Sequence, residues 1–195
     1  MSVQADLEQF SALITKWNAA QNLVSRETLA TLWPRHIDDS LQLAEHVPVA
    51  VRHIIDIGSG GGFPAIPLAI ASRETERRFT LLEPVQKKAA FLRTVARELK
   101  LPVTVHAVRA EAFDSRETAD LVTSRALAPL PKLLGYAVRF MGPQSHALLH
   151  KGREFRVEVE DAAQLFDFDV LEHPSRTDAW GVILDISNLR AKSAR

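Results

Sequence analysis

Three glycines that follow an acidic residue are the part of this chain best suited to hold a ligand. An apolar Ile-Ile run ends in Asp56, and glycines follow at Gly58, Gly60 and Gly62. A glycine loop directly after a strand brings backbone N–H groups close to a bound nucleoside. Phe63 stands where the third glycine of the dinucleotide fingerprint Gly-x-Gly-x-x-Gly would fall, which disfavours a nucleotide-dependent dehydrogenase.

The spacing instead resembles the acidic-x-Gly-x-Gly-x-Gly loop of S-adenosylmethionine-dependent methyltransferases. Glu83 ends the next apolar run, 25 residues after Gly58. A carboxylate at that place accepts hydrogen bonds from ribose hydroxyls. It suits S-adenosylmethionine, whose ribose has no 2′-phosphate to repel it. The alternative is a surface glutamate in front of Pro84.

The residues after the fourth apolar run limit the methyl acceptor. Arg125 lies in Ser-Arg-Ala-Leu, where enzymes that methylate exocyclic amines carry Asn/Asp-Pro-Pro-aromatic. The chain has no cysteine, which excludes cysteine-dependent C5 methylation of pyrimidines. Guanine N7 already has a free lone pair, so binding and in-line alignment suffice for it. Arg125 can fork onto the N7/O6 edge or a phosphate, and the alternative is a structural salt bridge.

The other polar and aromatic residues carry weaker signals. The seven histidines show no metal-ligand spacing, so we expect no metal. His36 differs because it lies in the dense polar run Arg35-His-Ile-Asp-Asp-Ser40. Lys88 is expected in the first turn of a helix at the ligand end of the sheet. The three tryptophans, Trp17, Trp33 and Trp180, are expected in the core rather than as base-stacking platforms.

Short apolar runs alternate with helical patterns from Ile54 onward, which predicts βαβ units and a mostly parallel sheet. The expected strands are His53–Ile57, Arg78–Glu83, Val103–Ala107, Ala119–Ser124, Ala147–Lys151, Phe166–Leu171 and Trp180–Ile186, the last two as a hairpin. The expected helices are 3–19, 28–46, Pro64–Ala71, Val85–Lys100, Pro129–Phe140 and Phe155–Leu165. Ligands of such sheets bind beyond the carboxyl ends of the strands.

The length of 195 residues predicts one domain, 1–195. The helical and strand patterns divide it into a helical cap at 1–50 and an α/β sheet at 51–195. The net charge is zero, with 24 basic and 24 acidic residues. Two blocks, 73–110 and 125–156, each carry a net charge of +5. They are either a phosphate-binding surface or solvated helix faces. No stretch is apolar enough to span a bilayer and no secretory signal begins the chain, so we expect a cytoplasmic protein.

Several motifs together resemble one family, the bacterial 16S rRNA guanine-N7 methyltransferases, also named after glucose-inhibited division protein B. The matching segments are Asn22–Ser25, Arg35–Ser40, Asp56–Ala69, Thr80–Glu83, Lys87–Arg93, Ser124–Ala126 and Lys151-Gly152. They cover most of 17–153 in the family's order, and the likeness fades beyond Arg153. Gly61, Phe63 and Ala65 depart from the family's usual Pro, Leu and Gly.

The resemblance implies a Rossmann-like class I methyltransferase fold, with seven strands and the last one antiparallel. It implies methyl transfer from S-adenosylmethionine to N7 of one guanosine in 16S rRNA, by a monomer that binds the small ribosomal subunit without a membrane or metal. The implied cofactor contacts are Asp56, Gly58, Gly60, Gly62, Phe63, Glu83, Ala110, Glu111 and Arg125. The implied RNA contacts are Arg35, Lys88, Arg93, Arg125, Lys151 and Arg153. Arg125, His36 and Asp39 are the candidates for catalysis, without a required general base.

Two other functions stay open at this stage. A small-molecule methyltransferase on the same sheet would have a closed apolar acceptor pocket. A ribosome-assembly factor would bind RNA without turnover.

Overall fold

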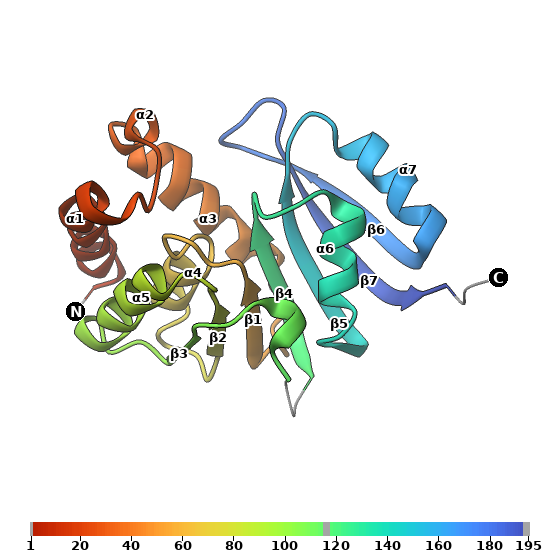
Figure 1. The fold of residues 1–195 in the computed structure, drawn as a ribbon, viewed down its shortest axis with the longest axis horizontal. Helices are drawn as coiled ribbons and strands as arrows, with labels where there is room; N and C mark the ends of the chain where they lie inside the picture. The colour runs from red at the N-terminus through yellow and green to blue at the C-terminus, as the bar shows by residue number, and fades with distance from the viewer. Residues whose placement is uncertain (1, 115–117, 193–195) are drawn as a thin grey trace.

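The computed structural model describes residues 2–114 and 118–192 and is built around a seven-stranded sheet (Figure 1). The strand order is β3-β2-β1-β4-β5-β7-β6. The strands are β1 His53–Ile57, β2 Arg78–Leu82, β3 Val103–His106, β4 Ala119–Arg125, β5 Met141–Lys151, β6 Phe166–Pro174 and β7 Val182–Ala191. Strands β1 to β5 pair in parallel, and β7 is antiparallel to both β5 and β6. The predicted class I sheet is confirmed.

Helices cover both faces of this sheet (Figure 1). Helices α1 Val3–Gln21, α4 Ala65–Ala71 and α5 Gln86–Glu98 lie on one face, and α6 Leu130–Ala137 and α7 Phe155–Leu165 lie on the other. Ile54 of β1 belongs to the first core, whereas its neighbour Ile55 belongs to the second. Adjacent strand residues point to opposite faces, so a strand buried on both sides must be apolar throughout.

The N-terminal segment packs onto the first of these cores. Leu7, Phe10 and Ile14 of α1 share one buried cluster with Ile66 of α4 and Phe91 of α5. The helices of 1–50 are therefore continuous with the sheet's core. The boundary at residue 50 stays a prediction.

The prediction of one helix over 28–46 was wrong. The segment contains α2 Arg26–Leu29, the π-helix η1 Trp33–Asp38, α3 Asp39–Leu41 and the 3-10 helix η2 Gln42–His46. Pro34 lies in the first turn of η1 and has no backbone N–H to donate. A change of helix type within a run often marks a functional site. Here the π segment carries His36.

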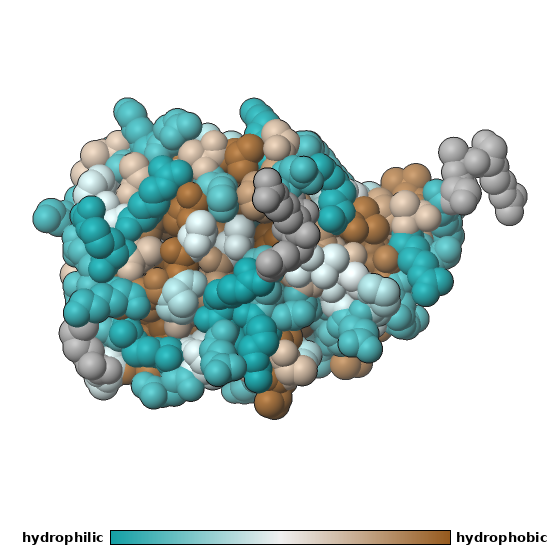
Figure 2. Space-filling model, turned by 90° about the horizontal axis from the view of Figure 1, so that it is seen from below, coloured by the Kyte–Doolittle hydropathy of each residue, from teal (hydrophilic) through white to brown (hydrophobic). Residues whose placement is uncertain are grey.

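The strands near the C-terminus also differ from the prediction. Strand β5 begins at Met141 rather than Ala147, and β7 runs from Val182 to Ala191 rather than from Trp180 to Ile186. Trp180 belongs to the turn that precedes β7, where its backbone N–H donates to the Asp178 side chain at 2.9 Å. The β6–β7 loop, 175–181, lies at the same edge of the molecule as α2 (Figure 1). On the face seen from below, hydrophobic side chains show in several separate places between hydrophilic ones (Figure 2).

Candidate functional site

A cavity of about 350 Å³ lies beyond the carboxyl ends of β1, β2 and β4. This volume is within the range of ordinary small-molecule sites. The glycine loop forms its floor, and Glu83 and Lys88 line it. Apolar side chains from three segments complete the lining, namely Leu23, Val24, Phe63 and Leu127. The predicted ligand edge of the sheet is thus a real cavity.

The glycine loop has a conformation and a packing that exclude side chains. Gly58, Gly60 and Gly62 all have positive φ, at 72°, 54° and 97°. A Cβ on Gly58 would lie 2.6 Å from the side chain of Leu127, and one on Gly62 would lie 2.7 Å from that of Ile66. The backbone can therefore run directly under a ligand, as the glycine spacing predicts.

Two carboxyl groups lie beside this loop. Glu83 is 4% exposed and accepts hydrogen bonds at 2.8 Å from the backbone N–H groups of Gly60 and Val85. Asp56 lies behind the loop, where one oxygen accepts from the Thr123 hydroxyl at 2.7 Å and the other has no partner among the described residues. Of these two carboxyl groups only Glu83 lines the cavity, where it can accept hydrogen bonds from a ligand.

Burial controls the protonation of Asp56. The side chain is fully enclosed, and this desolvation raises its pKa from the usual 3.8 to about 6. Hydrogen bonds from Ser59 and Thr123 oppose the shift, and the Arg125 guanidinium opposes it as well.

Arg125 is the centre of a polar cluster on the open side of the cavity. Its guanidinium donates to the Arg35 carbonyl at 3.0 Å, to the Asp39 carboxylate at 3.2 Å and to His36 Nδ1 at 2.6 Å. It also lies over the Phe63 ring, 5.1 Å from the centroid. The helical cap and strand β4 thus meet at one side chain. The sequence left two roles open for Arg125, a structural salt bridge and ligand binding. Arg125 pairs with Asp39 and also lines the cavity, so one position allows both roles.

His36 is held as a neutral ring in this cluster. It stacks on Phe63 with a centroid distance of 5.0 Å. Burial, and then the Arg125 charge, lowers the pKa of His36 to about 4. Because Arg125 has only donors, Nδ1 of His36 must accept, which places the proton on Nε2. That buried Nε2–H has no partner among the described residues.

Asp39 and His150 extend the cluster toward the second half of the sheet. Asp39 accepts from the Thr177 hydroxyl at 2.6 Å and from the Gln42 amide at 2.9 Å. His150, near the end of β5, bonds through Nε2 to the Asp39 carbonyl at 2.9 Å. Two small cavities of about 230 and 240 Å³ flank this cluster, and Arg125 lines both of them as well as the larger one.

The remaining predicted cofactor contacts lie apart from this cavity. Ala110 and Glu111 follow β3 in the 3-10 helix η3 Ala110–Ala112 and do not line it. The Ala110 carbonyl accepts from the Arg139 guanidinium at 3.0 Å. Hydrogen bonds from its own backbone and from Tyr136 lower the pKa of Glu111. Their contact with a cofactor stays a prediction from the resemblance.

The predicted RNA contacts fall into two groups. Arg35 and Arg153 are exposed and Lys88 lines the cavity. Arg93 is exposed as well, and it donates to the Val105 carbonyl at 3.0 Å, which ties α5 to β3. Lys151 pairs with Glu158 at 2.5 Å, donates to the Ala128 carbonyl at 3.0 Å and has a side chain only 9% exposed. Internal partners thus enclose Lys151, and the contact of both cations with RNA stays a prediction.

Some site residues were not predicted from the sequence. His150 is the penultimate residue of a predicted strand, so the rule that ligands bind beyond carboxyl ends offered a signal for it. Thr177 and Asp178 come from the β6–β7 loop, where no motif in the sequence marks them. The expectation that all three tryptophans are buried was wrong for Trp180, which is 62% exposed.

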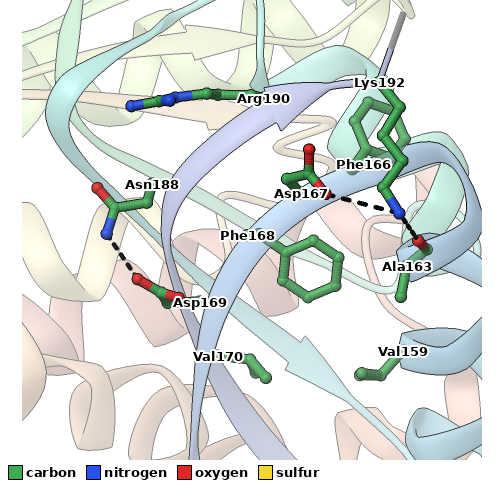
Figure 3. A pocket seen from close by; sticks show the side chains of 10 residues that line it. All are labelled: Val159, Ala163, Phe166, Asp167, Phe168, Asp169, Val170, Asn188, Arg190 and Lys192. Carbon is green, nitrogen blue, oxygen red and sulfur yellow. Dashed lines mark hydrogen bonds and ion pairs between the residues drawn. The ribbon is translucent and has the colours of Figure 1, made fainter.

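A larger hollow of about 550 Å³ lies between α7, β6 and β7 and does not include the glycine loop (Figure 3). Several of its polar side chains already have partners within the protein. Lys192 lies 3.5 Å from Asp167 and donates to the Ala163 carbonyl, and Asn188 donates to Asp169 at 2.6 Å. The glycine-loop cavity of about 350 Å³ is therefore the better candidate for the functional site.

Two further properties concern only the described parts of the chain, 2–114 and 118–192. There, no three His, Asp or Glu side chains are grouped so that they could hold a metal ion. Nor does any helix in these ranges have the length and hydropathy to cross a bilayer.

Comparison with known proteins identifies the family to which these features belong. The sequence profile of GidB, described as rRNA small subunit methyltransferase G, matches residues 3–179. The chain belongs to this family. It is 46% identical over 184 residues to "Ribosomal RNA small subunit methyltransferase G" of Gluconobacter oxydans (strain 621H), covering 94% of this chain and 93% of that protein. The protein of the same name from Chelativorans sp. (strain BNC1) is 44% identical over 186 residues, covering 94% and 88%.

A solved methyltransferase shares the fold at low sequence identity. The O-methyltransferase from Bacillus cereus, in complex with SAH, superposes with a TM-score of 0.61 at 17% identity, covering 92% of this chain and 91% of that one. The predicted family and fold class are both confirmed.

Proposed function

We propose that this chain transfers the methyl group of S-adenosylmethionine to N7 of a guanosine in the 16S rRNA of the small ribosomal subunit. The observation that carries the proposal is the glycine-loop cavity, which opens onto the Arg125 cluster in a member of the rRNA small subunit methyltransferase G family. The cavity would bind the methyl donor, and the Arg125 cluster would face the methyl acceptor; this open side of the cavity is called the acceptor side.

The cavity fits S-adenosylmethionine in shape and charge. Gly58 and Glu83 line the same cavity, where the Glu83 carboxylate would accept hydrogen bonds from the ribose hydroxyls. Leu23, Phe63 and Leu127 offer apolar surface to the adenine. When bound, the cofactor supplies a methyl group on a positively charged sulfur.

The protein's own groups then need only to align guanine N7 with the methyl group and to stabilise the positive charge that develops on the base. Guanine N7 attacks with its own lone pair, so no side chain removes a proton. The neutral His36 ring and the fixed Arg125 guanidinium offer donors to the acceptor base. The product 7-methylguanine is cationic, and the Asp39 carboxylate lies at the same cluster to stabilise the developing charge.

We also infer that residues 1–195 form one domain that works as a cytoplasmic monomer without a metal ion. The core that α1 shares with α4 and α5 supports the single domain. The mass of the purified protein in solution, measured by light scattering, tests the monomer.

Methyl transfer from labelled S-adenosylmethionine tests the activity. The acceptors are undermethylated 30S subunits, free 16S rRNA and a mixture of small metabolites, followed by nucleoside analysis. We expect the label in 7-methylguanosine. The variant Glu83→Ala should bind the cofactor at least tenfold more weakly, because it removes a buried acceptor of two backbone N–H groups.

The matched control is Glu76→Ala, whose side chain is 90% exposed and whose activity should not change. Label in a metabolite would favour a small-molecule methyltransferase. Binding of RNA and cofactor without transfer to any acceptor would favour a non-catalytic assembly factor. Either result would refute the proposal.

A further inference from the structure

An exposed indole lies beside the polar cluster of the site. Trp180 is 62% exposed, although tryptophan is usually well buried. The Arg153 guanidinium lies over its ring, 4.1 Å from the centroid. An aromatic ring with a planar cation against one face leaves the other face open to a flat partner.

The backbone of the loop that carries Trp180 forms a tight, hydrogen-bonded turn. Within 175–181, the backbone N–H of Trp180 donates to the Asp178 carboxylate at 2.9 Å, and the backbone N–H of Gly181 donates to the Asp178 carbonyl at 3.0 Å. A Cβ on Gly181 would lie 3.0 Å from that of Ser175, so the turn closes tightly. The backbone of such a loop has little conformational entropy to lose on binding.

The same loop is fastened to the cluster around Arg125. The Thr177 hydroxyl donates to Asp39 at 2.6 Å, and the Arg176 backbone N–H donates to the Gln42 side chain at 3.0 Å. Asp178 and Gly181, on either side of Trp180 in the chain, line the cavity of about 240 Å³ that Arg125 also lines. Trp180 is therefore at the rim of the acceptor side.

The charges at this rim suit a polyanion. Arg153 and Arg35 are exposed cations, and Arg35 has a side chain 54% exposed. The one carboxylate of the loop, Asp178, lies 3.6 Å from the Arg35 guanidinium and accepts from the Trp180 backbone. Unpaired bases of RNA stack on aromatic rings and on Arg guanidinium planes, with the phosphates on neighbouring cations.

We propose that Trp180, with Arg153 against one face, is a stacking platform for an unpaired rRNA base next to the nucleotide that is methylated. The inference rests on the proposed function for the identity of the RNA. It assigns a base-binding role to the β6–β7 loop, beyond the motifs that mark the cofactor site.

Binding and kinetics on the full chain test this platform. The probes are single-stranded oligoadenylate and 16S rRNA for binding, and 30S subunits for KM. Trp180→Ala should weaken binding of both RNAs about tenfold and raise KM by a similar factor. Trp180→Phe should keep most of the affinity, because a smaller ring still stacks. The affinity for S-adenosylmethionine should not change in either variant.

Fluorescence gives a second, direct readout. Oligoadenylate should quench the wild-type emission, and the quenching should be absent in Trp180→Phe, because Trp17 and Trp33 are packed against the first core. The matched control is the variant Val49→Ala, which should bind RNA like the wild type. Val49 is an apolar residue that is 87% exposed and lines none of the three cavities around Arg125.

Wild-type RNA affinity in Trp180→Ala would overturn the inference. So would a rise in KM for 30S subunits without weaker binding of naked RNA, which would mean that the loop contacts a ribosomal protein. If the wild type transfers no methyl group to 16S rRNA but still loses RNA affinity in Trp180→Ala, the proposed function fails and the platform remains.

Discussion

At the scale of single residues, the burial of Asp56 makes the stability of this protein depend on pH. Burial raises its pKa from 3.8 to about 6. Between these values the folded state keeps a proton that the unfolded state has released. The free energy of unfolding therefore contains a contribution that is fully present below pH 3.8 and is lost as pH rises through 6.

Asp56→Asn removes this contribution, because an amide does not titrate. The difference in unfolding free energy, wild type minus Asp56→Asn, should fall by about 2 kcal/mol between about pH 4 and pH 7. Urea unfolding at several pH values measures it. Glu76→Gln, whose carboxylate is 90% exposed, should give a difference that stays nearly constant with pH. A constant difference for Asp56→Asn would show that the folded protein does not hold this proton.

At the scale of elements, a buried ion pair between Asp39 and Arg125 joins the helical cap to a strand of the sheet. Asp39 of α3 lies 3.2 Å from Arg125 of β4, and the two side chains are 14% and 17% exposed. Burial lowers the pKa of Arg125 and the Asp39 carboxylate raises it. Removing the carboxylate would leave a buried cation without its counter-charge.

The chain also offers a matched exposed pair in the same region. Arg176 and Glu45 lie 2.7 Å apart, but both side chains are 60% exposed. Asp39→Asn should lower the free energy of unfolding by about 3 kcal/mol, whereas Glu45→Gln should lower it by less than about 1 kcal/mol. Urea unfolding of both variants measures this. Equal losses would mean that the cap is not anchored through Arg125.

The sequence predicted those elements whose pattern is local. The β1 run, the glycine loop and Glu83 at the end of β2 could be placed because a buried strand and a glycine turn each have a strong local signature. The π-helix at Trp33–Asp38 could not, since its hydrophobic spacing is close to that of an ordinary helix and Pro34 alone hinted at a change.

Side-chain partners were the hardest feature to predict. The family resemblance implies that Lys151 contacts RNA, and no motif indicated that Glu158 of α7 pairs with it inside the protein. Trp180 looked like a core residue by its type, yet its loop turns it outward. In both cases tertiary packing decides, and neither periodicity nor composition encodes it.

At the scale of the whole molecule, zero net charge limits how strongly the protein attracts RNA without regard to shape. The chain has 24 basic and 24 acidic residues. Among the six predicted RNA cations, Arg125 pairs with Asp39 and Lys151 pairs with Glu158, whereas Arg93 donates to the Val105 carbonyl and does not line the cavity. The cations that remain at or near the glycine-loop cavity are Arg35, Lys88 and Arg153. About three phosphates would therefore be neutralised on binding.

The salt dependence of RNA binding should therefore be shallow. Each neutralised phosphate contributes about −0.7 to −0.9 to the slope of log K against log salt, so three give a slope of about −2 to −3. Arg153→Ala should reduce the magnitude of this slope by about 1, whereas Lys151→Ala should change it little. Filter binding of 16S rRNA over a range of salt concentrations measures both. A slope near −8 would mean that the two basic blocks act together as one phosphate-binding surface, and the affinity would then come from charge rather than from a shaped rim.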